Sequence, residues 1–105
     1  MNPRRNGDPG FRVTTLNSAQ QNLRSVYRRA RTVGRVADVS QAMRAIFRQL
    51  RADARNCGEE TGNMPNARLT MRTVALAPVI VIYGVHDEHP EVFIRNVIDM
   101  FGDIP

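Results

Sequence analysis

Hydrophobic positions in the first half of the chain recur at the spacing of α-helices. From residue 18 to 34 and again from 38 to 55, apolar side chains follow one another at intervals of three and four, which places them on one helical face. Ser18 and Asp38 are candidate N-terminal caps, and Gly34 is a candidate terminator of the first helix. The two apolar faces consist of Ala19, Leu23, Val26, Tyr27, Ala30 and Val33, and of Val39, Met43, Ile46, Phe47, Leu50 and Ala54.

The remaining apolar segments follow the period of β-strands. Residues 11–16 and 68–74 alternate apolar and polar side chains, which predicts half-buried strands. Residues 78–83 are almost wholly apolar, as is typical of a central strand. Residues 92–97 form a further strand-like segment after a predicted turn at 86–90. The short connections favour an antiparallel meander of the last three segments.

Three segments lack a periodic pattern. Residues 1–10 contain two prolines and two glycines, which predicts a flexible arm. Residues 56–66 contain two glycines, three asparagines and a proline, which predicts a loop. Residues 98–105 are expected to pack back on the core or to contact a partner. The pattern predicts one α+β domain over residues 11–105, with a short N-terminal strand and an antiparallel two-helix hairpin packed on an antiparallel sheet of three to four strands.

Composition narrows the class of protein. A chain of 105 residues is enough for one core and too short for two domains. The longest apolar run, residues 74–83, is interrupted by a proline and falls short of the roughly 20 residues that span a bilayer. The N-terminus has no apolar stretch of the secretory type. Cys57 is the single cysteine, so no internal disulfide forms, and a cytoplasmic location is expected.

Charge is distributed unevenly along the chain. All fifteen basic residues are arginine, a bias that also fits the codon usage of a GC-rich genome. Residues 18–56 hold nine arginines against two aspartates, whereas residues 57–105 hold three arginines against seven carboxylates. The predicted hairpin is therefore strongly basic and the predicted sheet is acidic.

Arginines recur at helical spacing beside each apolar face. Carboxylates three or four residues away are nearly absent, so pairing within one helix does not neutralise these stripes. They are candidates for binding phosphates, with an affinity that falls as salt rises, or an acidic protein partner, and the alternative is a solvated surface. The predicted binding residues are Arg24, Arg28, Arg31, Arg35, Arg44, Arg48, Arg51 and Arg55.

A second group of residues suggests RNA cleavage without a metal. That reaction needs a base, an acid and cations for the phosphate charge. Arg68 and Arg72 lie on one face of a regular strand and are candidate cations, and Tyr83 or His86 is a candidate for proton transfer. The alternative is that both arginines are solvated and that Tyr83 belongs to the core.

The acidic turn and the cysteine carry weaker signals. His86 and His89, with the neighbouring carboxylates, have the composition of a metal site, but Pro90 places them in a turn, which favours a solvated hairpin tip. Cys57 has no base at a useful spacing and is interpreted as incidental. No metal and no cofactor is therefore expected.

The order strand, two helices and three strands, at this length, resembles the RelE/ParE superfamily of bacterial toxins. The likeness is carried by residues 68–72, which alternate basic and apolar side chains, by the Val-Ile-Tyr and Asp-Glu pattern within 81–88, and by 92–95. The resemblance implies a helical hairpin on a twisted sheet and a neutralising antitoxin that wraps around it. It also implies a target, which is ribosome-bound messenger RNA in the RelE branch and DNA gyrase in the ParE branch.

The nuclease signature of that family is largely absent from this sequence. Ile80 or Val81 occupies the position where the nuclease branch carries an arginine, and residues 98–103 are acidic where that branch is basic and aromatic. We therefore expect a toxin-like component of a type II toxin–antitoxin system that acts by binding. The alternative is a non-toxic basic binding module on the same scaffold, for nucleic acid or for an acidic protein.

Overall fold

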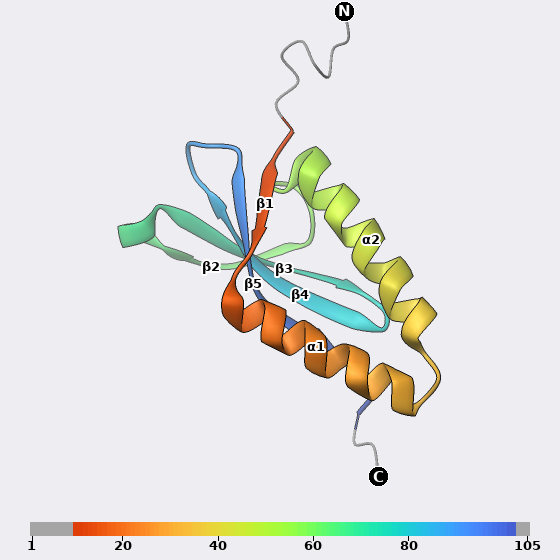
Figure 1. The fold of residues 1–105 in the computed structure, drawn as a ribbon. Coiled ribbons are helices and arrows are strands. Elements are labelled where there is room, and N and C mark those ends of the chain that lie inside the picture. Colours follow the sequence, from red (N-terminus) through yellow and green to blue (C-terminus); the bar gives the residue numbers. More distant parts are fainter. Residues whose placement is uncertain (1–9, 103–105) are drawn as a thin grey trace, which may run out of the picture.

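The structure is a computed structural model that describes residues 10–102. The predicted flexible arm, residues 1–10, lies outside the described residues except for Gly10, which is buried. The end of the predicted tail, residues 103–105, also lies outside them. The elements, in chain order, are β1 (Arg12–Thr15), α1 (Asn17–Thr32), α2 (Val36–Asp53), β2 (Glu59–Met64), a single 3₁₀ turn η1 (Pro65–Ala67), β3 (Leu69–Leu76), β4 (Val79–His86) and β5 (Glu91–Asp99) (Figure 1).

The described chain is α+β, with a two-helix hairpin on a five-stranded mixed sheet. The strand order is β1-β5-β4-β3-β2. The predicted antiparallel meander is confirmed, since β3 pairs with β4 and β4 with β5 in antiparallel fashion. The expected three to four antiparallel strands are corrected at both edges, because β1 pairs with β5 in parallel and β2 adds a fifth strand. The helical hairpin between β1 and the rest of the sheet is long enough to allow the parallel pairing.

The expectation of a loop over residues 56–66 was wrong. Six of these residues form β2, which pairs with β3 from Glu59 opposite Thr73 to Met64 opposite Leu69. All six side chains of β2 are exposed, so the strand has no buried face. Its sequence therefore lacks the apolar alternation that predicts a strand. A register shift between Glu60 and Gly62 further interrupts the pattern.

Both helix starts differ from the predicted caps. Helix α1 begins after Leu16, and no side chain caps it. The Ser18 hydroxyl donates instead to the carbonyl of Arg95 at 3.2 Å, which ties the helix to β5. Helix α2 begins after Arg35, again without a side-chain cap, and Asp38 forms an ion pair with Arg35. A tertiary contact at the start of α1, and a local ion pair at the start of α2, thus replace the side-chain caps that the sequence predicts.

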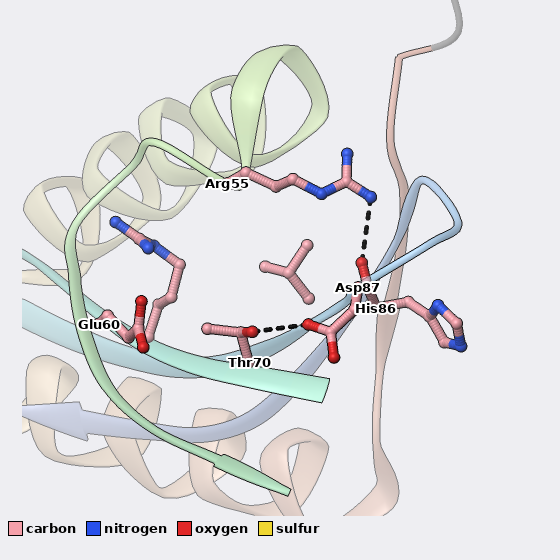
Figure 2. Close-up of a pocket in the computed structure, with 7 residues that line it drawn as sticks. Arg55, Glu60, Thr70, His86 and Asp87 are labelled. Carbon is pink, nitrogen blue, oxygen red and sulfur yellow. Dashed lines mark hydrogen bonds between the residues drawn. The ribbon is translucent and has the colours of Figure 1, made fainter. Parts of the chain in front are cut away.

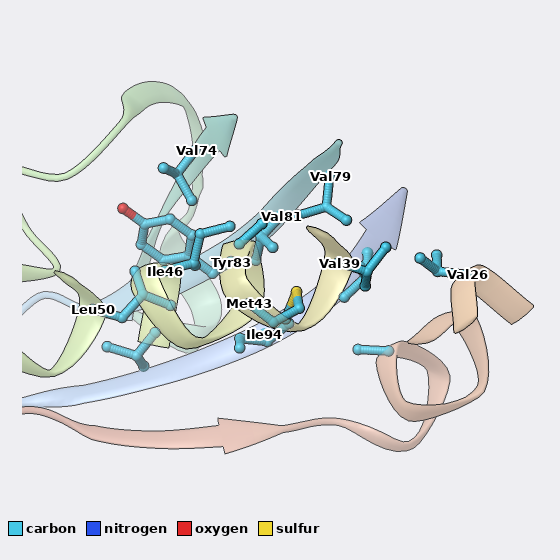
Figure 3. Packing of buried hydrophobic residues seen from close by; sticks show 14 of the residues in the cluster. Val26, Val39, Met43, Ile46, Leu50, Val74, Val79, Val81, Tyr83 and Ile94 are labelled. Carbon is cyan, nitrogen blue, oxygen red and sulfur yellow. The ribbon is translucent and has the colours of Figure 1, made fainter. Parts of the chain in front are cut away.

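The core lies between the helical hairpin and one face of the sheet (Figure 3). Helix α2 contributes Ile46 and Leu50, and β4 contributes Val81 and Tyr83, all fully buried. Burial of each such aliphatic side chain stabilises the fold by about 1.5–3 kcal/mol. Val33, predicted on the apolar face of the first helix, is 40% exposed because it follows the last helical residue, Thr32.

Gly58 is expected to tolerate no side chain. Its φ is +68°, and a Cβ would lie 2.3 Å from the Thr73 carbonyl oxygen. Gly58→Ala should therefore lower the free energy of unfolding by about 2–4 kcal/mol, measured by urea denaturation. Gly34→Ala is the matched control, because Gly34 has a φ of +71° but open space around the Cβ, and about 1 kcal/mol is expected. Equal losses in the two variants would contradict the close approach.

Candidate functional site

The arginine stripes lie on the exposed surface of the helical hairpin. Arg24, Arg28 and Arg31 of α1 and Arg44 and Arg48 of α2 are all exposed. Within residues 10–102, these five side chains form no hydrogen bond or ion pair. We call these five residues the free arginines.

Three of the eight predicted binding arginines are engaged within the fold. Arg35 pairs with Asp38. The Arg51 guanidinium lies over the Phe47 ring, 5.6 Å from its centroid. Arg55 donates to the carbonyls of His86 and His89, at 3.0 Å each. A ninth arginine of the hairpin, outside the eight predicted binding residues, is also engaged: Arg29 forms an ion pair with Asp99 at 2.9 Å.

A shallow cavity of about 530 Å³ lies along the flank of α1, among three of the free arginines. Leu23 and Tyr27 are half-buried there and pack against the core. The Tyr27 hydroxyl lies 3.2 Å from Ser40 Oγ, so this flank is the one that faces α2. Helix α1 therefore presents apolar surface and unpaired positive charge side by side. The lining residues are Gln20, Leu23, Arg24, Tyr27, Arg28 and Arg31.

The structure brings together two of the three predicted catalytic residues. Arg72 and Tyr83 are opposite one another on β3 and β4. The Tyr83 hydroxyl donates toward the carbonyls of Cys57 at 2.5 Å and Ala54 at 3.1 Å, and Arg72 Nε donates to the same Cys57 carbonyl at 2.8 Å. Burial of Tyr83 raises the pKa of its hydroxyl far above the ordinary value. Both side chains therefore hold the segment that follows α2.

Arg68 lies apart from that pair. It precedes β3 in a left-handed conformation, with φ of +56°. Its exposed guanidinium forms an ion pair with Glu88 of the β4–β5 turn at 2.8 Å. The prediction that residues 68–72 form one regular strand, with Arg68 and Arg72 on the same face, is therefore wrong for Arg68.

A second, smaller cavity of about 210 Å³ lies beyond the end of α2 (Figure 2). Charged side chains of both signs reach it from separate elements. Arg55 follows α2, Glu60 comes from β2, Arg72 comes from β3 and Asp87 comes from the β4–β5 turn. We call it the charged cavity. Its lining residues are Arg55, Glu60, Thr70, Arg72, Val85, His86 and Asp87.

Sequence reasoning missed the acidic half of this cavity. Glu60 lies in the segment expected to be a loop, and it enters the site only because β2 places it opposite Arg72. The Asp87 carboxylate is positioned by the Thr70 hydroxyl, which donates to it at 2.6 Å. No local spacing in the sequence relates Glu60 and Asp87 to the arginines of the cavity. Their proximity could be predicted only from the register of the strands.

The His86 side chain forms hydrogen bonds within the β4–β5 turn, and His89 lies beside it. His86 Nδ1 accepts the backbone N–H groups of Glu88 and His89, at 3.0 and 3.1 Å. Figure 2 shows the His86 imidazole directed away from the charged cavity. The His86 and His89 rings lie 4.6 Å apart. Over residues 10–102, no group of three or more His, Cys, Asp or Glu side chains is arranged to hold a metal ion.

Comparisons with known proteins supply no assignment. No protein-family model matches the chain, and a search of curated proteins finds no significant relative. Among the helices in the described part of the chain, none is long and apolar enough to cross a membrane. The free arginines and the two cavities are therefore the features of the described residues that point to a function.

Proposed function

We propose that this protein is a toxin-like component of the RelE/ParE type that acts by binding, through the free arginines of its helical hairpin. The observation that carries the proposal is the exposure of five arginines that nothing in residues 10–102 neutralises. The order of elements in the hairpin and meander, together with the sequence patterns within 68–95, supports the family.

The unpaired arginines carry an energetic cost. Like charges at i,i+4, such as Arg24 with Arg28 and Arg44 with Arg48, destabilise a helix by about 0.2–0.5 kcal/mol per pair. An anionic partner removes that repulsion and gains charge-assisted hydrogen bonds. Because Leu23 and Tyr27 lie among the arginines in the cavity on α1, the surface suits an acidic protein segment with apolar side chains, such as an antitoxin.

Several contacts argue against catalysis as the main activity. Arg72 and Tyr83 are occupied by backbone carbonyls. The charged cavity has carboxylates as candidate bases, but the His86 imidazole, a candidate acid, points away from it (Figure 2). A metal-free ribonuclease needs both groups at the phosphate. A binding function is the better fit to this geometry.

A second candidate function is a non-toxic module that binds nucleic acid. The free arginines on two successive helices favour it, because guanidiniums spread over two helices can contact successive phosphates. Such a module leaves cell growth unaffected, whereas the toxin-like protein arrests it.

Induced expression in a bacterial host is expected to arrest growth, and co-expression of the product of the adjacent gene is expected to relieve the arrest. Growth curves and viable counts measure both effects. A variant in which Arg24, Arg28, Arg44 and Arg48 are glutamine supplies the control, because it removes the charge of four of the five free arginines and leaves the core intact. Harmless expression of the wild-type protein at high level would contradict the toxin proposal.

A further inference from the structure

The charged cavity contains two cations and two carboxylates that do not pair with one another. The ion pairs within residues 10–102 are Arg29–Asp99, Arg35–Asp38 and Arg68–Glu88, none of which involves the cavity. Opposite charges that share a cavity of about 210 Å³ without meeting are positioned for a molecule between them. We propose that the charged cavity binds a small zwitterion, of the chemical class of a free α-amino acid.

The two guanidiniums are held in place by the fold. Arg72 donates from Nε to the Cys57 carbonyl at 2.8 Å and from Nη2 to the Gly58 carbonyl at 2.9 Å, which leaves Nη1 available. Arg55 donates from Nη2 to the carbonyls of His86 and His89. The Arg55 guanidinium also lies 5.0 Å from the centroid of the Phe11 ring. Both side chains are therefore oriented before any ligand arrives, and each keeps N–H groups that a carboxylate in the cavity could accept.

The two carboxylates supply the opposite half of the site. Asp87 accepts a hydrogen bond from Thr70 through Oδ1, which leaves Oδ2 available. Within the described residues, Glu60 forms no hydrogen bond or ion pair through its carboxylate. An ammonium group has three donors, and these two carboxylates are the acceptors that fit it. The buried Val85 adds an apolar side chain to the lining of the same cavity.

The balance of charge selects the ligand class. A simple anion is attracted by the two arginines but repelled by Glu60 and Asp87. A simple cation is attracted by the two carboxylates but repelled by the arginines. A divalent metal ion needs several converging acidic ligands, and the described residues contain no such group. A molecule with both charges gains on both sides. Its contacts would join β2, β3, the segment after α2 and the β4–β5 turn, so binding should stabilise the fold.

Isothermal titration calorimetry with a panel of free amino acids tests the proposal, with acetate and methylammonium as single-charge probes. We expect at least one amino acid to bind and to raise the melting temperature, and neither single-charge probe to do so at equal concentration. Glu60→Gln should weaken the binding about 10-fold or more, because it removes one charge-assisted contact.

Glu59→Gln is the matched control. Glu59 is the neighbouring residue of β2 and lies on the other face of the sheet, outside the cavity. The Glu59→Gln variant should therefore bind the amino acid with the same affinity as the wild-type protein. The proposal is overturned if no amino acid binds at millimolar concentration, if acetate binds equally well, or if the two variants lose affinity alike. These outcomes do not depend on the free arginines, so they leave the proposed function untouched.

Discussion

Tyr83→Ala is expected to lower the free energy of unfolding by about 3–5 kcal/mol, the range for removal of a large aromatic side chain from a core. Tyr83 is fully buried and is the largest of the fully buried side chains. Its hydroxyl also binds the segment after α2 through the carbonyls of Ala54 and Cys57. Chemical denaturation measures the loss. Tyr27→Ala, at a half-buried position, should cost clearly less, and equal losses would contradict the central place of Tyr83.

The same residue predicts how stability depends on pH. Burial raises the pKa of the Tyr83 hydroxyl above the ordinary value of 10.0, so the unfolded chain releases this proton at a pH where the folded chain keeps it. The contribution of Tyr83 is therefore complete below about pH 10 and is lost progressively as the pH rises above that value. Tyr83→Phe should be less stable at neutral pH by about 1–2 kcal/mol and should lose less stability in alkali. Parallel alkaline curves for the two proteins would contradict this account.

Replacing Arg24, Arg28, Arg44 and Arg48 together by glutamine is expected to lower the affinity for an acidic partner at least ~100-fold at low salt, because four charge-assisted contacts are lost. All four side chains are exposed and lack partners within the described residues, so the fold should be retained, with a slight gain in stability from the removed repulsion. Fluorescence anisotropy with an amphipathic peptide of glutamate and leucine measures the affinity, and circular dichroism checks the fold.

A charge-matched comparison locates the effect. Arg24→Gln with Arg28→Gln removes two charges from the hairpin, and Arg12→Gln with Arg95→Gln removes two exposed charges from β1 and β5. The first pair should weaken binding strongly and the second only slightly. Equal effects would mean that net charge, rather than the arginine surface of the hairpin, determines the affinity.

The sequence predicted the elements that have a buried face. The two helices and β3 were predicted because their apolar positions repeat at the helical and strand periods, and β4 was predicted because residues 78–83 form an almost unbroken apolar run. β2 was missed because all its side chains are exposed. The parallel pairing of β1 with β5 joins residues that are far apart in the sequence, and no local pattern encodes it.

The candidate site was predicted only where local spacing in the sequence determines it. The arginine stripes follow from helical spacing alone, but the division into free and engaged arginines depends on tertiary contacts, such as those of Arg55 with the β4–β5 turn. Arg72 and Tyr83 were selected for their chemistry, and the structure shows them holding backbone carbonyls. The charged cavity needs the register of β2 on β3, which an exposed edge strand does not reveal.

The salt dependence of binding tests the central claim most directly. Anisotropy titrations of the glutamate–leucine peptide, repeated over a range of NaCl concentrations, give the logarithm of the affinity against the logarithm of salt. For the wild-type protein we predict a steep decline, and for the variant without Arg24, Arg28, Arg44 and Arg48 a weak and nearly flat response. Wild-type binding that does not change with salt, or that the variant reproduces, would contradict a hairpin surface built to receive negative charge.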